Sequence, residues 1–146
     1  MQEASKDIRW IQRFQNYKRA FSLLDEIIND DGFDDYPVII KEGAIQRFEY
    51  TLELGWKVFK DYLEYNYVKL IVTTPKNVVK ECAAHGIFEE AGIKPEIYLK
   101  MLESRNFMSH TYDYDKFIKS VSKIKNVYFF QLRNEYEYFL SKELNE

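Results

Sequence analysis

The sequence predicts an all-α protein, an up-and-down helical bundle of about five helices. Helix breakers are sparse, with 5 glycines and 3 prolines in 146 residues, while 31% of the residues are charged. Apolar side chains also recur at alternating steps of three and four over long segments, which is typical of amphipathic helices. The length fits a single domain spanning residues 1–146, large enough to bury a core without a metal or a disulfide.

The first helix is predicted from about residue 6 to residue 29 and ends at Gly32. Its core-facing row is Trp10, Phe14, Tyr17, Phe21, Leu24 and Ile28. The turn that follows has no basic residue but carries Asp25, Glu26, Asp30, Asp31, Asp34 and Asp35. Such a cluster indicates either a solvated turn or an acidic contact for a basic partner protein.

Pro37 suits the first turn of a second helix, which is predicted to run to about Asn66. Its core-facing row is Ile45, Phe48, Leu52, Trp56, Phe59 and Leu63. Gly43 and Gly55 lie inside this helix, where we expect each to allow close approach of a neighbouring helix. Glu53 is expected to pair with Lys57 along the helix, and we attach no function to that pair.

Residues 68–73 are β-branched and apolar, but no second strand is available, so we predict an extended connector. Thr74 and Pro75 then open a short helix that ends near His85 and Gly86. Cys82 is interpreted as a small buried side chain, and His85 as a helix cap. Pro95 opens a fourth helix that leads into Arg105. A last long helix follows Asp113, and its core-facing row is Phe117, Val121, Ile124, Tyr128, Leu132, Tyr136 and Phe139.

Composition excludes several classes of function. A formal net charge of -3 argues against a broad, sequence-independent nucleic-acid binder. One cysteine and two histidines are too few for a Cys/His zinc site, and we expect no metal and no cofactor. No signal peptide or membrane span is evident, so the expected location is cytoplasmic.

One segment combines the groups that acid–base chemistry needs. Arg105 supplies a permanent cation suited to phosphate oxygens, His110 titrates near neutral pH, and Tyr112 follows two positions later. Arginine and histidine together suffice for metal-free RNA cleavage: the imidazole moves a proton and the guanidinium stabilises the anionic phosphorane. The alternative is structural, with an arginine at a helix end and a histidine bonded to a carboxylate.

Geometry restricts the catalytic reading. Five residues of continuous helix place two positions about 140° apart around the axis. Arg105 and His110 therefore converge only if the helix kinks or ends between them, or if they come from different subunits. A two-fold dimer would also bring two histidines together, one as base and one as acid.

A row of lysines follows the motif. Lys116, Lys119 and Lys123 lie at helical spacing, joined by Lys125, so the surroundings of His110 are locally basic. We interpret Lys116, Lys119 and Lys123, together with Asn106, as candidate substrate-binding residues. A solvated helix face is the alternative.

Two segments resemble a known family. Ala44-Ile45-Gln46-Arg47-Phe48-Glu49-Tyr50-Thr51-Leu52-Glu53-Leu54-Gly55-Trp56-Lys57 is similar to the second-helix signature of the nucleotidyltransferase substrate-binding proteins, which belong to the HEPN superfamily and include the HepT toxins. Arg105-Asn106-Phe107-Met108-Ser109-His110-Thr111-Tyr112-Asp113 resembles their second signature.

The resemblance implies a homodimer that works with a separately encoded minimal nucleotidyltransferase. In HepT-type members the Arg-X4-His-X-Tyr pattern is the ribonuclease site of a toxin–antitoxin pair, which maps onto Arg105, His110 and Tyr112. The partner enzyme transfers AMP to the motif tyrosine, here Tyr112, and so silences the toxin. Other members are described as non-catalytic subunits that hold the substrate of the transferase, and this remains the alternative function.

Overall fold

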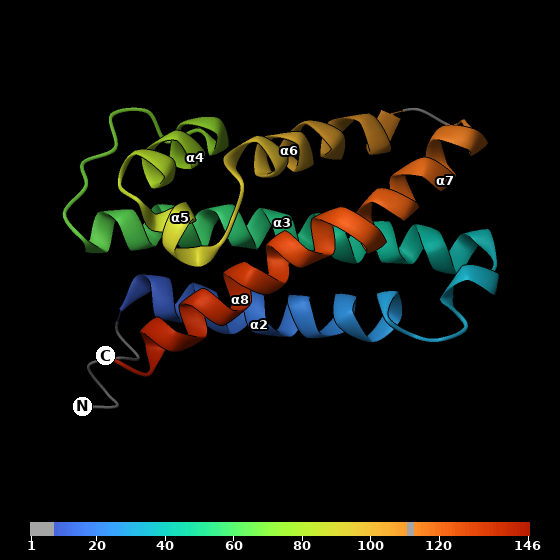
Figure 1. Ribbon diagram of the computed structural model, residues 1–146, viewed down its shortest axis with the longest axis horizontal. Coiled ribbons are helices and arrows are strands. Elements are labelled where there is room, and N and C mark those ends of the chain that lie inside the picture. Colours follow the sequence, from blue (N-terminus) through green and yellow to red (C-terminus); the bar gives the residue numbers. More distant parts are fainter. Residues whose placement is uncertain (1–7, 111–112) are drawn as a thin grey trace.

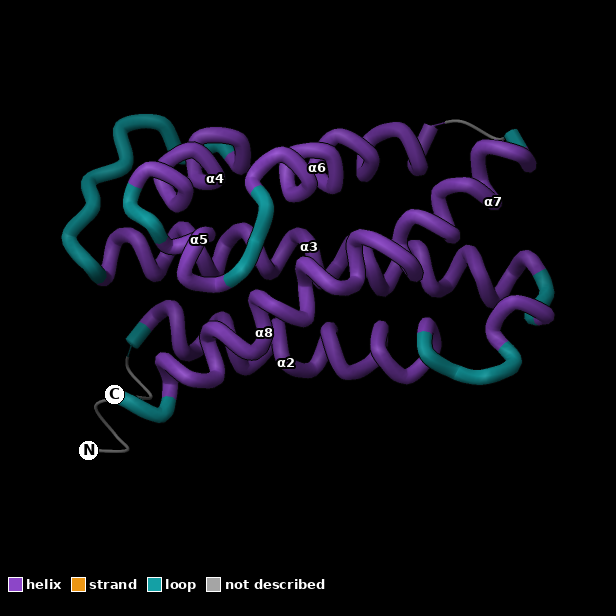
Figure 2. Tube along the Cα trace, viewed as in Figure 1, coloured by secondary structure: helices purple, strands orange, loops and turns teal. Residues whose placement is uncertain are grey.

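The computed structural model describes the backbone of residues 8–110 and 113–146, and side chains for residues 8–105 and 113–146. Within these ranges the chain is helix and loop without a strand, which confirms the predicted all-α class (Figure 2). The elements in order are α2, η1, α3, α4, α5, α6, α7, η2 and α8. Figure 1 shows α2 and α3 as a long pair, α4 and α6 beside α3, and α7–α8 crossing the pair.

Helices α2 (Arg9–Ile28) and α3 (Val38–Tyr65) form an antiparallel hairpin. The predicted core row of α2 is buried as expected, from Trp10 to Ile28. The turn between the helices contains a 3-10 helix, η1 (Phe33–Asp35), whose Phe33 is fully buried. Pro37 caps α3 in an extended conformation, one residue before the helix begins.

Residues 68–74 form an irregular connector, as predicted, and lead to α4 (Pro75–Ala84). Thr74 is the N-cap, and its hydroxyl accepts a hydrogen bond from the Asn77 amide at 3.3 Å. A further helix, α5 (Ile87–Ala91), was not predicted. It is a single short turn between Gly86 and Gly92, both at φ +74, a left-handed conformation in which glycine carries little strain.

The C-terminal helix is continuous in path but changes its winding. Helix α7 (Tyr114–Lys123) passes through a π-helical turn, η2 (Ile124–Tyr128), into α8 (Phe129–Glu143). The core-facing residues Ile124, Tyr128 and Leu132 are spaced by four, which is wider than the 3.6 residues of an α-helical turn. The wider turn keeps both Ile124 and Tyr128 buried.

Aromatic side chains fill the core, as the composition predicts. Phe139 lies at the centre and contacts rings from three helices, with centroid distances of 5.5 Å to Trp10 and 4.8 Å to Phe59. Fully buried rings include Trp10, Phe14, Tyr17, Phe48, Phe59, Phe88 and Tyr98. Cys82 is also fully buried, and burial raises the pKa of its thiol, so the prediction of a structural cysteine is confirmed.

The two glycines of α3 have different roles. A Cβ at Gly55 would lie 2.9 Å and 3.0 Å from the two carboxyl oxygens of Glu135, so close approach is confirmed there. Among the described residues, nothing lies within 4 Å of a Cβ built at Gly43, so the same explanation is wrong for that residue. Glu135 is itself fully buried and accepts a hydrogen bond from the Tyr98 hydroxyl at 2.9 Å.

Candidate functional site

Helix α6 (Pro95–His110) carries the motif arginine near its end. Its backbone is helical from Arg105 to His110, so the helix does not end between them. Arg105 has a described side chain, whereas those of Asn106, His110 and Tyr112 lie outside the described residues. The continuous helix excludes an end between the two residues, and it is compatible with contributions from different subunits.

Arg105 lies against α3. Its Nη1 donates a hydrogen bond to Oε2 of Glu53 at 2.6 Å, and the two groups form an ion pair. The Arg105 side chain is 28% exposed and that of Glu53 is 41% exposed, so the pair sits at the surface seam between α3 and α6. The contact holds a flexible cation in one orientation beside the end of α6.

Other charged side chains surround this pair. The other carboxyl oxygen of Glu53 lies 3.6 Å from Nζ of Lys57, which confirms the predicted pairing along α3. Glu49 lies one turn earlier on the same helix. Partial burial raises the pKa of Glu49, and the positive charge of Arg105 opposes that rise. Arg105 is thus flanked by two carboxyl groups from the first signature segment.

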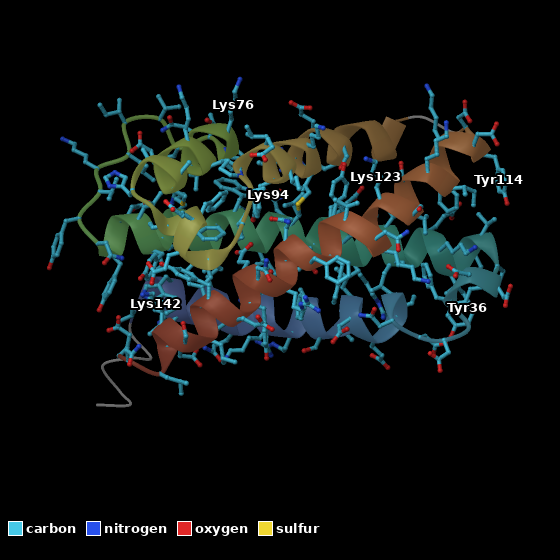
Figure 3. The ribbon with its side chains drawn as sticks, viewed as in Figure 1. Tyr36, Lys76, Lys94, Tyr114, Lys123 and Lys142 are labelled. Carbon is cyan, nitrogen blue, oxygen red and sulfur yellow. The ribbon has the colours of Figure 1, made fainter. Side chains whose placement is uncertain are left out.

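The lysine row lies on α7, directly after the motif. Lys116, Lys119 and Lys123 are exposed, in agreement with a surface available to a ligand or to solvent. Asp113 is the N-cap of α7, and its carboxylate accepts a hydrogen bond from the Lys116 amide at 3.2 Å. Figure 3 shows Tyr114 at the end of the bundle where α6 finishes, with Lys123 further along α7.

The Arg105–Glu53 contact joins residues that are 52 positions apart, one in each of the two segments whose sequences resemble a known family. A family model described as nucleotidyltransferase substrate binding protein like matches residues 12–141. The chain belongs to this family. As the family's name implies, a nucleotidyltransferase substrate-binding protein works with a nucleotidyltransferase. A comparison of the chain with curated proteins finds no match.

Sequence reasoning missed the role of Glu53 in this substrate-binding protein. Helical spacing predicts only its pair with Lys57, because such spacing shows neighbours along one helix and not across two. A usable signal was present: Glu49 and Glu53 lie four apart in the first signature, on one face of α3. Two acidic residues on one face suggest a cation from another helix.

In the described part of the chain, no group of three His, Cys, Asp or Glu side chains is arranged to hold a metal ion. No helix in residues 8–110 and 113–146 is long and apolar enough to cross a membrane.

Proposed function

We propose that this chain is a HepT-like partner subunit of a minimal nucleotidyltransferase and a metal-independent endoribonuclease toxin. The transferase silences it by attaching AMP to Tyr112. The observation that carries the proposal is the anchored Arg105: a partly exposed guanidinium, fixed at 2.6 Å by Glu53 beside the end of α6. A preorganised cation of this kind stabilises charge that develops on a phosphate without further reorganisation.

The reaction needs no group beyond the chain and RNA. His110 of one subunit accepts the proton of a 2′-hydroxyl, and the 2′-oxygen attacks the adjacent phosphorus. The bond from phosphorus to the 5′-oxygen breaks, and the leaving oxygen takes a proton from the second subunit's histidine, in its protonated form. The products are a 2′,3′-cyclic phosphate and a free 5′-hydroxyl, and Arg105 stabilises the phosphorane between them.

A homodimer is part of this proposal. Because α6 is helical throughout, positions 105 and 110 of one chain are about 140° apart around the helix axis. A two-fold arrangement pairs Arg105 of one subunit with His110 of the other and supplies two histidines per site. The exposed lysines Lys116, Lys119 and Lys123 attract the RNA backbone to an otherwise acidic protein, and the neutral amide of Asn106 hydrogen-bonds to it.

Silencing by AMP follows from charge and size. A nucleotide on the Tyr112 hydroxyl brings a negative phosphate within two residues of His110, where it blocks and repels an incoming RNA backbone. Co-expression with the nucleotidyltransferase should add the mass of AMP to the wild-type chain and not to Tyr112→Phe. AMP found on the Tyr112→Phe chain would contradict the assignment.

Growth of bacteria that express the chain alone tests the nuclease. We expect growth arrest by the wild type, relief by His110→Ala, and no relief by His85→Ala, which removes the other histidine. Growth arrest that persists unchanged in His110→Ala would contradict the proposed nuclease activity. A non-catalytic subunit that holds the substrate of the transferase would then be the better description, since the pairing of Arg105 with Glu53 also suits a purely structural arginine.

A further inference from the structure

The α2–α3 hairpin has a second patterned face besides the one that packs into the core. On α2 this row follows steps of four and three and consists of Arg9, Arg13, Asn16, Ala20, Leu23 and Ile27. On α3 a matching row consists of Ile40, Gly43, Arg47, Tyr50 and Leu54. Arg47 joins the two rows, because its Nη1 donates to the Leu23 carbonyl oxygen at 2.8 Å. We call the two rows together the outer face.

The centre of the outer face is apolar although it is open to solvent. Leu23 is 48% exposed, Ile40 39% and Tyr50 65%, and Ile39 beside them is 74% exposed. Alternating steps of three and four on neighbouring helices are the pattern by which one helix packs against another. This face therefore has the pattern of a helix contact without a partner among the described residues.

One end of the outer face is a basic groove. Its volume is about 510 Å³, and the described residues that line it, Arg9, Gln12, Arg13, Asn16 and Leu54, include no carboxylate. Arg13 is fixed in place because its Nε donates to Oδ2 of the buried Asp61 at 2.6 Å. The groove thus presents the Arg9 guanidinium to an acidic ligand, beside the Arg13 guanidinium, whose charge is paired with Asp61.

The other end of the hairpin is acidic. The turn between α2 and α3 holds Asp30, Asp31, Asp34 and Asp35, all of them exposed, and of these Asp34 pairs with Lys125 at 3.0 Å. It lies at the opposite end of the helix pair from Arg9 and Arg13, as Figure 1 shows for the turn and the start of α2. The hairpin therefore has a basic end, an apolar middle and an acidic end along one face.

We propose that a second copy of this chain docks on the outer face with its own hairpin antiparallel. The two-fold axis lies in the contact plane, perpendicular to α3, near Arg47 and Tyr50. Each acidic turn then meets the basic groove of the other copy, and the apolar centres pack together. A parallel arrangement would instead set acidic turn against acidic turn, which like-charge repulsion disfavours.

This arrangement has a consequence for the motif. A two-fold axis perpendicular to α3 in the contact plane reverses the helices but keeps both copies of α6 on the same side of the dimer. Arg105 is tied to Glu53, which is one turn from Tyr50 on α3. The two motif arginines therefore come near the axis together. The inference rests on the dimer of the proposed function and names its interface.

Sedimentation equilibrium of three proteins tests the face. Wild type and Ile71→Arg should have the same dimer dissociation constant, because Ile71 is 91% exposed in the connector and lies off the outer face. Tyr50→Arg should raise that constant at least tenfold, since it puts a charge at the centre of the contact. Both positions are exposed, so neither change should unfold the chain. An unchanged constant in Tyr50→Arg would overturn the inference.

Charge reversal tests the orientation. Arg9→Glu and Asp31→Lys should each weaken the dimer several-fold, and the double variant should recover most of the loss because it restores opposite charges across the interface. If the double variant weakens the dimer by the sum of the two single effects, the antiparallel docking is wrong.

Two further outcomes separate this inference from the function it rests on. A wild-type chain that stays monomeric at all concentrations tested would remove the dimer itself. A dimer that survives Tyr50→Arg, with RNA binding lost in Arg9→Glu, would assign the groove to nucleic acid and overturn only the docking face.

Discussion

Arg105 of α6 and Glu53 of α3 are joined by a 2.6 Å ion pair that ties the end of the motif helix to the hairpin. The carboxylate fixes the orientation of the guanidinium, and both groups remain partly exposed. Because solvent screens such a pair, its value is positional, and it adds little to stability.

Removing the anchor should therefore separate activity from stability. In Glu53→Ala we expect RNA cleavage to fall at least about tenfold, because Arg105 loses its fixed orientation. The free energy of unfolding should change by less than about 1 kcal/mol, which urea titration measures. Glu64→Ala is the matched control, since Glu64 is 44% exposed and pairs with Lys60 at 3.0 Å on the same helix. Equal cleavage by Glu53→Ala and wild type would show that Arg105 needs no anchor.

The buried Glu135 should make stability depend on pH. Burial raises its pKa well above the ordinary value, while the hydrogen bond from Tyr98 opposes that rise. The folded state therefore holds the proton where the unfolded chain, with a pKa of about 4.3, releases it. Stability is fully present below that pH and is lost as pH rises toward the folded-state pKa.

Glu135→Gln should flatten this dependence between pH 5 and pH 8, as measured by urea unfolding at each pH. Glutamine keeps the shape and the acceptor for Tyr98 but does not titrate. Glu137→Gln, an exposed position on the same helix, should retain the wild-type slope. A slope that survives in Glu135→Gln would assign the pH dependence to other groups.

Gly55 and Gly43 should respond in opposite directions to alanine. A Cβ at Gly55 would lie 3.0 Å or less from Glu135 and 3.0 Å from the Tyr98 hydroxyl, so Gly55→Ala should cost roughly 1–3 kcal/mol. Gly43→Ala meets no described residue within 4 Å and should stabilise by about 0.5–1 kcal/mol. Urea unfolding of both variants is measured in chains that also carry Tyr50→Arg, because that change should weaken the dimer and so prevent dimer formation from affecting the comparison. Equal effects at both glycines would contradict the packing described here.

Asp113 should stabilise the start of α7. Its carboxylate accepts from the Lys116 amide, so Asp113→Ala should lower the free energy of unfolding by about 1 kcal/mol, and Asp113→Asn should preserve most of it. Thermal unfolding of the two variants checks this. If Asp113→Asn lowers the free energy of unfolding as much as Asp113→Ala does, the hydrogen bond from the Lys116 amide is not the source of the stability.

Much of the fold could be predicted from the sequence because the spacing of apolar residues along a helix shows which of its faces is buried. The rows from Trp10 to Ile28 and from Phe48 to Leu63 predict which faces meet the core, and Thr74-Pro75 predicts a helix start. Periodicity does not report which helices touch. The Arg105–Glu53 pair, the crowding of Gly55 by Glu135 and the open space at Gly43 all depend on packing between helices, so they needed the structure.

Two local features also escaped prediction for physical reasons. The single turn of α5 is too short for apolar residues to recur at helical spacing, and the glycines at its two ends are typical of loops. The π-helical turn at Ile124–Tyr128 appears in sequence only as consecutive steps of four, which an ordinary helix also tolerates. At the candidate site, the sequence supplied Arg105, His110 and Tyr112, and the structure added Glu53 as the anchor of Arg105.

Cleavage of RNA by a mixture of wild type and one inactive variant tests the shared site most directly. Wild type and His110→Ala are purified separately, mixed in equal amounts, and allowed to exchange subunits. If one site needs the histidines of both subunits, only the quarter of the dimers that are wild type in both subunits cleave RNA, so the rate is about a quarter of that of the same total amount of wild type. A rate of about half, with subunit exchange confirmed by mass, would contradict a site built across the dimer.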